Sequence, residues 1–266
     1  MIKFISLASG SSGNCYYLGL NGKGILIDAG IHVRQIKSAL SNVGISFESI
    51  MAVFVTHDHA DHIKSLSSLG EKYNLPIYAT RDTHAGINRN YCINPKLSTS
   101  VRYVEKLKTT ELFGFSLTPF EVPHDGSDNV GYFVEADGKT FCFVTDIGHI
   151  TPVVKDFGSK ANYLIIEANY DRNMLDMGRY PAFLKARITS PVGHLCNSDT
   201  AQFLIDIVNP DLKHIWLCHL SADNNHPEIA YKTVQMALAQ YGIIVDKDIK
   251  LTALKRTTPS ELYEFA

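Results

Sequence analysis

Short apolar runs bounded by glycine or polar residues recur along the whole chain. Runs of this kind, rich in β-branched and aromatic residues, are typical of β-strands. They predict strands at residues 2–7, 15–20, 24–27, 52–55, 77–79, 115–120, 130–135, 140–144, 164–166 and 215–218. Residues 135–139 carry Asp-Gly at their centre and predict a hairpin turn.

Longer stretches with apolar residues at helical spacing lie between these runs. They predict helices at residues 32–43, 63–73, 151–157, 199–208 and 227–241, with Asn197 or Ser198 as the cap of the fourth. Hairpin-like strand pairs alternate with helices throughout. We therefore expect an α/β protein, with two sheets between helical layers, as a single domain over residues 1–266.

Composition narrows the class of protein. The chain of 266 residues is 45% hydrophobic and has a net charge of −2, which argues against a globally basic nucleic-acid binder but not against a local basic patch. No stretch approaches the ~20 apolar residues of a membrane helix, and the apolar run at the N-terminus is too short for a signal peptide. The five cysteines form no Cys-x-x-Cys pair, which fits reduced thiols in a cytoplasmic protein.

The most distinctive segment is Thr-His-Asp-His-Ala-Asp-His at residues 56–62. It places three histidines and two acids directly after a predicted strand. Imidazole suits zinc and neighbouring divalent metals, and carboxylate adds tolerance for manganese or iron. A solvated surface loop is the alternative reading.

Three later strands also end at a residue of ligand type. His124, Asp146 and His219 each follow an apolar run. Ligands gather beyond the ends of strands in layered α/β folds, so these residues predict a metal site shared with the first segment.

In this order the residues resemble the metallo-β-lactamase superfamily. The resemblance covers nearly the whole chain and implies a four-layer αββα sandwich, in which two mixed sheets are flanked by helices. It also implies two divalent ions, zinc or manganese. One would be held by His57, His59 and His124, the other by Asp61, His62 and His219, and Asp146 would bridge them. Asp28 matches an early aspartate that braces the site without binding metal.

This ligand set indicates hydrolysis. Two divalent ions lower the pKa of a shared water, so a metal-bridging hydroxide forms near neutral pH. Asp61 could hold a metal and also orient or deprotonate that nucleophile. His59 stands where redox-active diiron members of the fold carry glutamate, and so favours hydrolysis.

Several other segments resemble the phosphodiesterases of the superfamily. Ser-Gly-Ser-Ser-Gly-Asn at 9–14, Gly-His-Leu-Cys-Asn at 193–197 and His-Leu-Ser at 219–221 are similar to the YycJ/WalJ-like group of bacterial single-domain exonucleases. That group is associated with digestion of DNA from the 5′ end. Cys196 departs from the serine that the group commonly has.

Within these segments we expect Ser11, Asn197, Ser221 and Asn225 to bind substrate phosphates and His194 to protonate the leaving group. An ordinary turn at Ser11 and helix caps at the other positions are the structural alternatives. Glu167 ends a predicted strand, where it could orient His194 or form a salt bridge.

Together the patterns predict a dinuclear metal-dependent phosphodiesterase that acts as an exonuclease on nucleic acid, preferentially DNA. A homo-oligomer is compatible with this reading. The alternative is a small-molecule hydrolase, such as a hydroxyacyl-thioester hydrolase or a lactonase. A non-catalytic metal-binding module would need a broken ligand set, whereas this set is complete.

Overall fold

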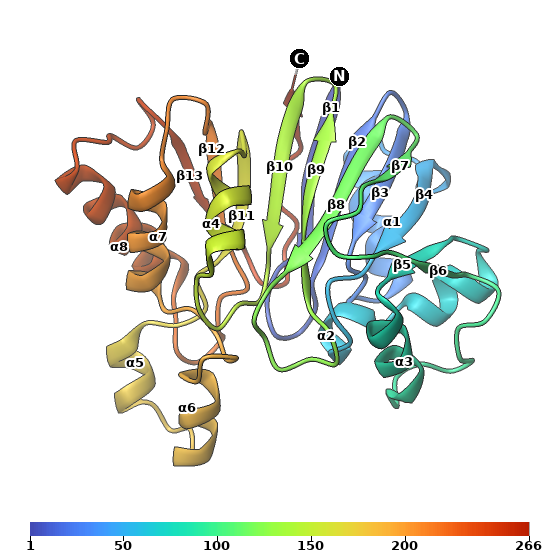
Figure 1. Cartoon of the computed structure of the whole chain (residues 1–266), viewed down its shortest axis with the longest axis horizontal. Helices are drawn as coiled ribbons and strands as arrows, with labels where there is room; N and C mark the ends of the chain where they lie inside the picture. The colour runs from blue at the N-terminus through green and yellow to red at the C-terminus, as the bar shows by residue number, and fades with distance from the viewer. Residues whose placement is uncertain (266) are drawn as a thin grey trace. The chain divides into compact units, whose positions relative to one another are not determined.

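The computed structural model describes residues 1–265, which form two mixed seven-stranded sheets with helices beside them (Figure 1). This confirms the predicted fold class. The chain groups into two compact units. Unit 1 contains residues 1–119, 126–130 and those from Lys255 onward, and unit 2 contains residues 120–125 and 131–254. The single domain expected from the sequence stays a prediction.

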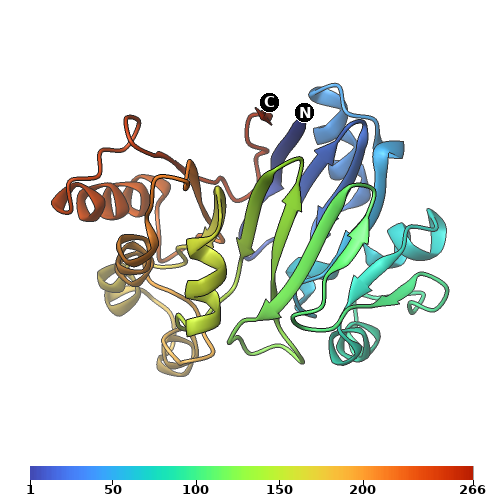
Figure 2. The ribbon, with the colours of Figure 1, turned by 45° about the horizontal axis from the view of Figure 1, so that its top comes forward.

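Unit 1 contains a sheet of order β14-β1-β2-β3-β4-β5-β6. Its strands are β1 (Ile2–Ala8), β2 (Cys15–Leu20), β3 (Lys23–Ile27), β4 (Ile50–Phe54), β5 (Ile77–Ala79), β6 (Val101–Tyr103) and β14 (Tyr263–Phe265). The first three strands are antiparallel, and β3 to β6 run parallel. Because β14 pairs antiparallel with β1, the two ends of the chain lie side by side (Figure 2).

Five short helical segments and one strand pair complete unit 1. They are α1 (Val33–Asn42), η1 (Phe47–Ser49), α2 (Ala60–Ile63), the π-helical turn η2 (Ser68–Lys72), α3 (Arg81–Arg89) and the antiparallel strands β7 (Thr110–Leu112) and β8 (Phe115–Glu121). The last two residues of β8 belong to unit 2. Helix α1 buries Ile36 and Leu40 in a core with Leu26 and Val53 of the sheet. That core fixes the ends of β3 and β4, where the loops with ligand-type residues begin.

Unit 2 is built around strands β9 (Val130–Ala136), β10 (Lys139–Val144), β11 (Tyr163–Glu167), β12 (His214–Cys218) and β13 (Lys250–Ala253). Strands β9 and β10 form a hairpin whose turn residues, Asp137 and Gly138, both have positive φ, as a two-residue type I′ turn requires. The other pairs are parallel. The middle strands β11 and β12 are almost wholly buried, which explains their continuous apolar sequences.

The helices of unit 2 are α4 (Pro152–Ser159), α5 (Arg172–Met177), α6 (Ala182–Ile188), α7 (Asn197–Ile207) and α8 (Pro227–Gln240). Helices α7 and α8 pack together, and Leu204 and Val234 from them join Leu164 and Leu217 of the sheet in one core. Among the described residues, no helix has the length and apolar character needed to cross a membrane.

The ten predicted strands are confirmed, and four of the five predicted helices are confirmed to within two residues at each end. The short strands β6, β7, β13 and β14 and the helices α3, α5 and α6 were not predicted.

The helix predicted at 63–73 is confirmed in part: residues 66–72 are helical, but residues 64–65 separate them from α2. Helix α2 ends at Ile63 because backbone groups of this stretch bond elsewhere: Asp61 O accepts from Asn14 N, and Ser65 N donates to Ala29 O. The cap predicted for α7 is wrong. Cys196 occupies that position, and its Sγ accepts from Asp199 N at 3.4 Å. The thiol of Cys196 therefore caps the helix, a role that the sequence pattern assigned to Asn197 or Ser198.

His214, at the start of β12, makes folding sensitive to acid. Burial and the nearby Lys250 ammonium lower the pKa of this imidazole from 6.5 to about 4. The unfolded chain therefore binds a proton between these values that the folded chain does not, so stability falls as the pH falls through this window. The variant His214→Phe keeps an aromatic ring against Trp216 but has no imidazole to protonate. Between pH 7 and pH 4.5, we expect its free energy of unfolding to fall by about 2 kcal/mol less than that of the unaltered protein. Urea unfolding of both proteins at the two pH values measures this. Identical losses would contradict it.

Candidate metal centre

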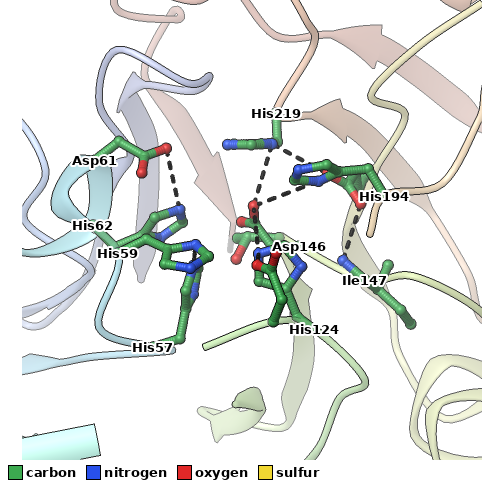
Figure 3. Close-up of polar contacts among 12 residues, drawn as sticks. His57, His59, Asp61, His62, His124, Asp146, Ile147, His194 and His219 are labelled. Atoms are coloured by element: carbon green, nitrogen blue, oxygen red, sulfur yellow. Dashed lines mark hydrogen bonds and ion pairs between the residues drawn. The ribbon is translucent and has the colours of Figure 1, made fainter. Parts of the chain in front are cut away.

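The first group of ligand-type side chains follows strand β4 in unit 1. We call His57, His59, Asp61 and His62 the first cluster (Figure 3). His57 and His62 are buried, and His59 and Asp61 are half-buried. His57 Nε2 lies 3.1 Å from His59 Nδ1, and the rings of His57 and His62 are 4.1 Å apart. Imidazole nitrogens of three histidines thus gather in one small volume.

Backbone contacts to two neighbouring loops hold this cluster in place. Asn14 N donates to Asp61 O at 2.7 Å, and Ala29 N donates to His62 O at 2.8 Å. A Cβ at Gly30 would lie 1.6 Å from Asp61 O, so only glycine lets the loops approach this closely. Asn14 also donates from Nδ2 to Asp61 Oδ2 at 3.3 Å.

Asp28 orients the last histidine of the cluster. It follows β3 with a φ of 60°, an uncommon backbone conformation outside glycine. Its carboxylate accepts from Thr56 N at 2.8 Å and from His62 Nδ1 at 2.7 Å. Burial raises the pKa of Asp28, and the contacts with His62 and Thr56 offset only part of this effect. Since His62 Nδ1 donates to a carboxylate, its Nε2 carries the lone pair that a metal needs.

The second group lies in unit 2. We call His124, Asp146, His194 and His219 the second cluster (Figure 3). Asp146 follows β10 and His219 follows β12, while Glu167 ends the strand between them. These parallel strands have their carboxyl ends at one edge of the sheet, where ligand-binding residues collect in α/β folds. Ligand atoms of Asp146, Glu167, His194 and His219 lie within 4.8 Å of one another.

Glu167 is the buried anchor of the second cluster. Its Oε1 accepts from His194 Nδ1 at 2.6 Å and from His219 Nδ1 at 3.1 Å. Its Oε2 accepts from the backbone N–H groups of Ile147 and Leu195 at 2.9 and 3.1 Å. Burial alone would raise the pKa of Glu167, but the attraction and hydrogen bond of His194 outweigh it and lower that pKa. Burial likewise opposes the charge on His194, and Glu167 reverses this and raises the pKa of His194.

One further contact fixes the imidazole of His124, and another fixes the backbone of His219. His124 Nδ1 donates to Gly193 O at 2.9 Å, and Asn169 Nδ2 donates to His219 O at 2.8 Å. His62, His124 and His219 therefore share one arrangement, with Nδ1 bonded to an oxygen of the protein. Each ring then presents Nε2 as its second nitrogen.

Sequence reasoning did not assign Asn14 and Asn169 to the site, and it left the role of Glu167 open. The position of Glu167 at the end of a fully buried strand was the available signal, because a buried carboxylate requires hydrogen-bond donors. Asn14 ends the segment at 9–14 that carries the resemblance, which was the available signal, whereas nothing in the local sequence of Asn169 distinguishes it from a turn residue.

The residues predicted to bind substrate have different surroundings. Ser11 is exposed in the loop between β1 and β2. Asn197 and Asn225 are buried and bond to each other through both amide groups, at 3.0 and 2.9 Å. Ser221 is buried, and its Oγ accepts from Asn224 N at 3.2 Å. The assignment of these four to substrate binding stays a prediction, and the contacts of the two asparagines give them a role in holding the loops.

Comparisons with known proteins agree with this arrangement. A family model described as a β-lactamase superfamily domain matches residues 23–211. A protein of Bacillus anthracis named exodeoxyribonuclease YycJ is 32% identical over 98% of both chains. One of Streptococcus pneumoniae named exodeoxyribonuclease WalJ is 35% identical over 97% of this chain and 96% of its own.

A solved structure with the same fold is the metallo-β-lactamase fold protein YhfI from Bacillus subtilis. It has a TM-score of 0.70 at 15% identity and covers 97% of this chain and 98% of its own. The family model spans more than half of the chain, and the two relatives align over nearly all of it. The chain therefore belongs to the metallo-β-lactamase superfamily.

Proposed function

We propose that this protein is a cytoplasmic exodeoxyribonuclease that hydrolyses DNA from the 5′ end with two divalent metal ions, zinc or manganese. The observation that carries the metal-dependent hydrolysis is the pair of clusters in which each anchored imidazole presents Nε2. The DNA substrate is inferred from the two relatives named exodeoxyribonucleases, which align over nearly the whole chain. The five cysteines are all free thiols, in keeping with a reducing compartment.

The donor set fits divalent metal ions. Metal-binding histidines almost always donate their other ring nitrogen to a carboxylate or a backbone carbonyl, as His62, His124 and His219 do here. We propose that His57, His59 and His124 hold one ion, and that Asp61, His62 and His219 hold the other. Asp146 would be shared. A mixed set of imidazole and carboxylate suits zinc and manganese.

When bound, such ions act as Lewis acids that lower the pKa of water and polarise a phosphoryl oxygen. The protein's own groups then manage protons and orientation. Asp61, whose Oδ2 accepts from Asn14, orients the attacking water or takes its proton. Because His194 Nδ1 is bonded to Glu167, the proton on Nε2 passes to the leaving sugar oxygen as its bond to phosphorus breaks.

The activity is tested directly with end-labelled substrates. Metal-loaded protein is incubated with single- and double-stranded DNA labelled at the 5′ or the 3′ end, with matched RNA, and with a hydroxyacyl thioester. We expect early release of labelled mononucleotide from 5′-labelled DNA and slow loss of the 3′ label. Thioester hydrolysis without DNA digestion would overturn the proposal in favour of a small-molecule hydrolase.

Loss of a proposed ligand should remove metal. We expect His57→Ala and His219→Ala each to bind less than the two equivalents of metal in the unaltered protein and to lose DNA hydrolysis. Elemental analysis after dialysis, together with the end-label assay, measures both. Full occupancy with an unaltered rate in either variant would remove that residue from the ligand set.

Asp58→Asn is the matched control. Asp58 lies between His57 and His59, but its carboxylate accepts from Ser127 N at 3.0 Å and from Ser127 Oγ at 2.5 Å. We expect this variant to retain two equivalents of metal, since its side chain is occupied away from the neighbouring imidazoles.

The proton-donor role of His194 predicts a dependence on the leaving group. His194→Ala should keep its metal and lower the rate on DNA by roughly 10²–10⁴, the usual contribution of a general acid. p-Nitrophenolate leaves without protonation, so hydrolysis of bis-p-nitrophenyl phosphate should fall far less. Equal losses on both substrates would exclude His194 as the proton donor. His149→Ala is the control: this exposed imidazole bonds only to Pro191 O among the described residues, so both rates should be unchanged.

A further inference from the structure

A groove of about 540 Å³ in unit 1 has no role in the chemistry described above. Leu7, Ala8 and Ile31 are buried side chains that form part of its wall. Its other lining residues come from the length of α1 and the residue before it, from the loop after β1, from Lys64 after α2 and from the segment before β14. Its volume is within the range of sites that bind small molecules or short segments of a polymer.

The charged side chains that line the groove are all basic. They are Arg34, Lys64 and Arg256, with the imidazole of His32 beside them, and no lining residue is an aspartate or a glutamate. Arg34 is exposed and makes no side-chain hydrogen bond or ion pair within residues 1–265. A guanidinium in that state can bind an anionic oxygen through two parallel hydrogen bonds.

The groove is connected to the first cluster through the loop at residues 9–14. Lys64 directly follows α2, which carries Asp61 and His62, and its Nζ donates to Ser12 O at 3.1 Å. Asn14, at the end of the same loop, donates to Asp61 Oδ2. On the side of the groove, a Cβ at Gly10 would lie 2.9 Å from Arg256 Cγ. One short loop therefore contacts both the proposed ligands and the basic side chains.

We propose that this groove binds the sugar–phosphate backbone of the DNA strand outside the bond that is cut. This inference rests on the proposed exodeoxyribonuclease function and adds a binding site for the part of the DNA strand that is not being cut. Guanidinium and ammonium groups would contact successive phosphates, and the apolar wall would face the sugars. No phenylalanine, tyrosine or tryptophan lines the groove, and the imidazole of His32 is the one aromatic ring among its lining residues. Stacking on such a ring tolerates any base. Recognition would thus be independent of base sequence, as processive digestion of a strand requires.

Binding of DNA to metal-free protein tests the groove without any hydrolysis. A fluorescein-labelled single-stranded oligonucleotide is titrated with the unaltered protein, with Arg34→Glu and with Arg256→Ala at several salt concentrations. We expect Arg34→Glu to weaken affinity about tenfold. Each lost phosphate contact should reduce the slope of log K against log salt by about 0.7. Arg256→Ala should act in the same direction, with a smaller effect because no charge is reversed.

Arg102→Glu is the matched control for net charge. Arg102 is exposed on β6, outside the lining of the groove, and its guanidinium bonds to the carbonyls of Thr99 and Val101. We expect it to leave affinity nearly unchanged. An unaltered Kd and salt slope in Arg34→Glu would overturn the proposal, and so would an equal loss in Arg102→Glu.

Kinetics with two substrates separate this inference from the proposed function. With loaded enzyme, Arg34→Glu should raise KM for DNA and leave the hydrolysis of bis-p-nitrophenyl phosphate unchanged, because that small ester does not reach the groove. DNA digestion that ignores Arg34 would leave the exonuclease standing and exclude the groove. Binding that depends on Arg34 without digestion would support the groove and exclude the exonuclease.

Discussion

Each cluster depends on a buried carboxylate that bonds to the Nδ1 of histidine. Burying a carboxylate is costly unless hydrogen bonds replace the lost water, and Asp28 and Glu167 both have several. Asp28 accepts from Thr56 N and His62, and Glu167 accepts from two backbone N–H groups and two imidazoles. These same bonds fix the rotation and the tautomer of the rings. The two buried carboxylates thereby determine where the Nε2 atoms of His62, His194 and His219 point.

The backbone conformations next to the clusters also help to orient the ligand-type side chains. Asp28 and His219 both have positive φ, at 60° and 52°, immediately after β3 and β12. Residues other than glycine adopt this region at a cost, and they tend to do so at functional sites, where surrounding contacts hold them. Here the sharp change of direction after a buried strand turns a side chain towards the cluster. The interrupted helix after α2 has a similar origin, since its backbone groups bond to the loops at residues 14 and 29.

For the proposed nuclease, the proposed metal ligands would account for cleavage but not for how a long polyanion is held. The net charge of −2 gives the whole protein little attraction for DNA, so basic side chains have to be gathered locally. The groove with Arg34, Lys64 and Arg256 is such a place. A loop shared with Asp61 would couple binding of the strand to the orientation of the first cluster. Under this arrangement, affinity for the strand and the chemistry of cleavage are supplied by different side chains.

The sequence alone determined most of the strand and helix pattern and predicted the residue types of the candidate metal centre. Apolar runs are read from local composition, and His-x-His-x-Asp-His is specific because few structural needs place so many ligands together. Only the tertiary structure decided what holds those ligands. Glu167 could be read as a strand-end salt bridge, Asn14 as a turn residue, and Cys196 was not considered as the cap of α7. Asn14 and Glu167 depend on partners far along the chain, Asp61 at 47 positions and His194 at 27, and Cys196 acts through an unusual acceptor, its thiol sulfur. The basic groove was likewise invisible, because Arg34, Lys64 and Arg256 come from three separate stretches of chain that only folding brings to one surface.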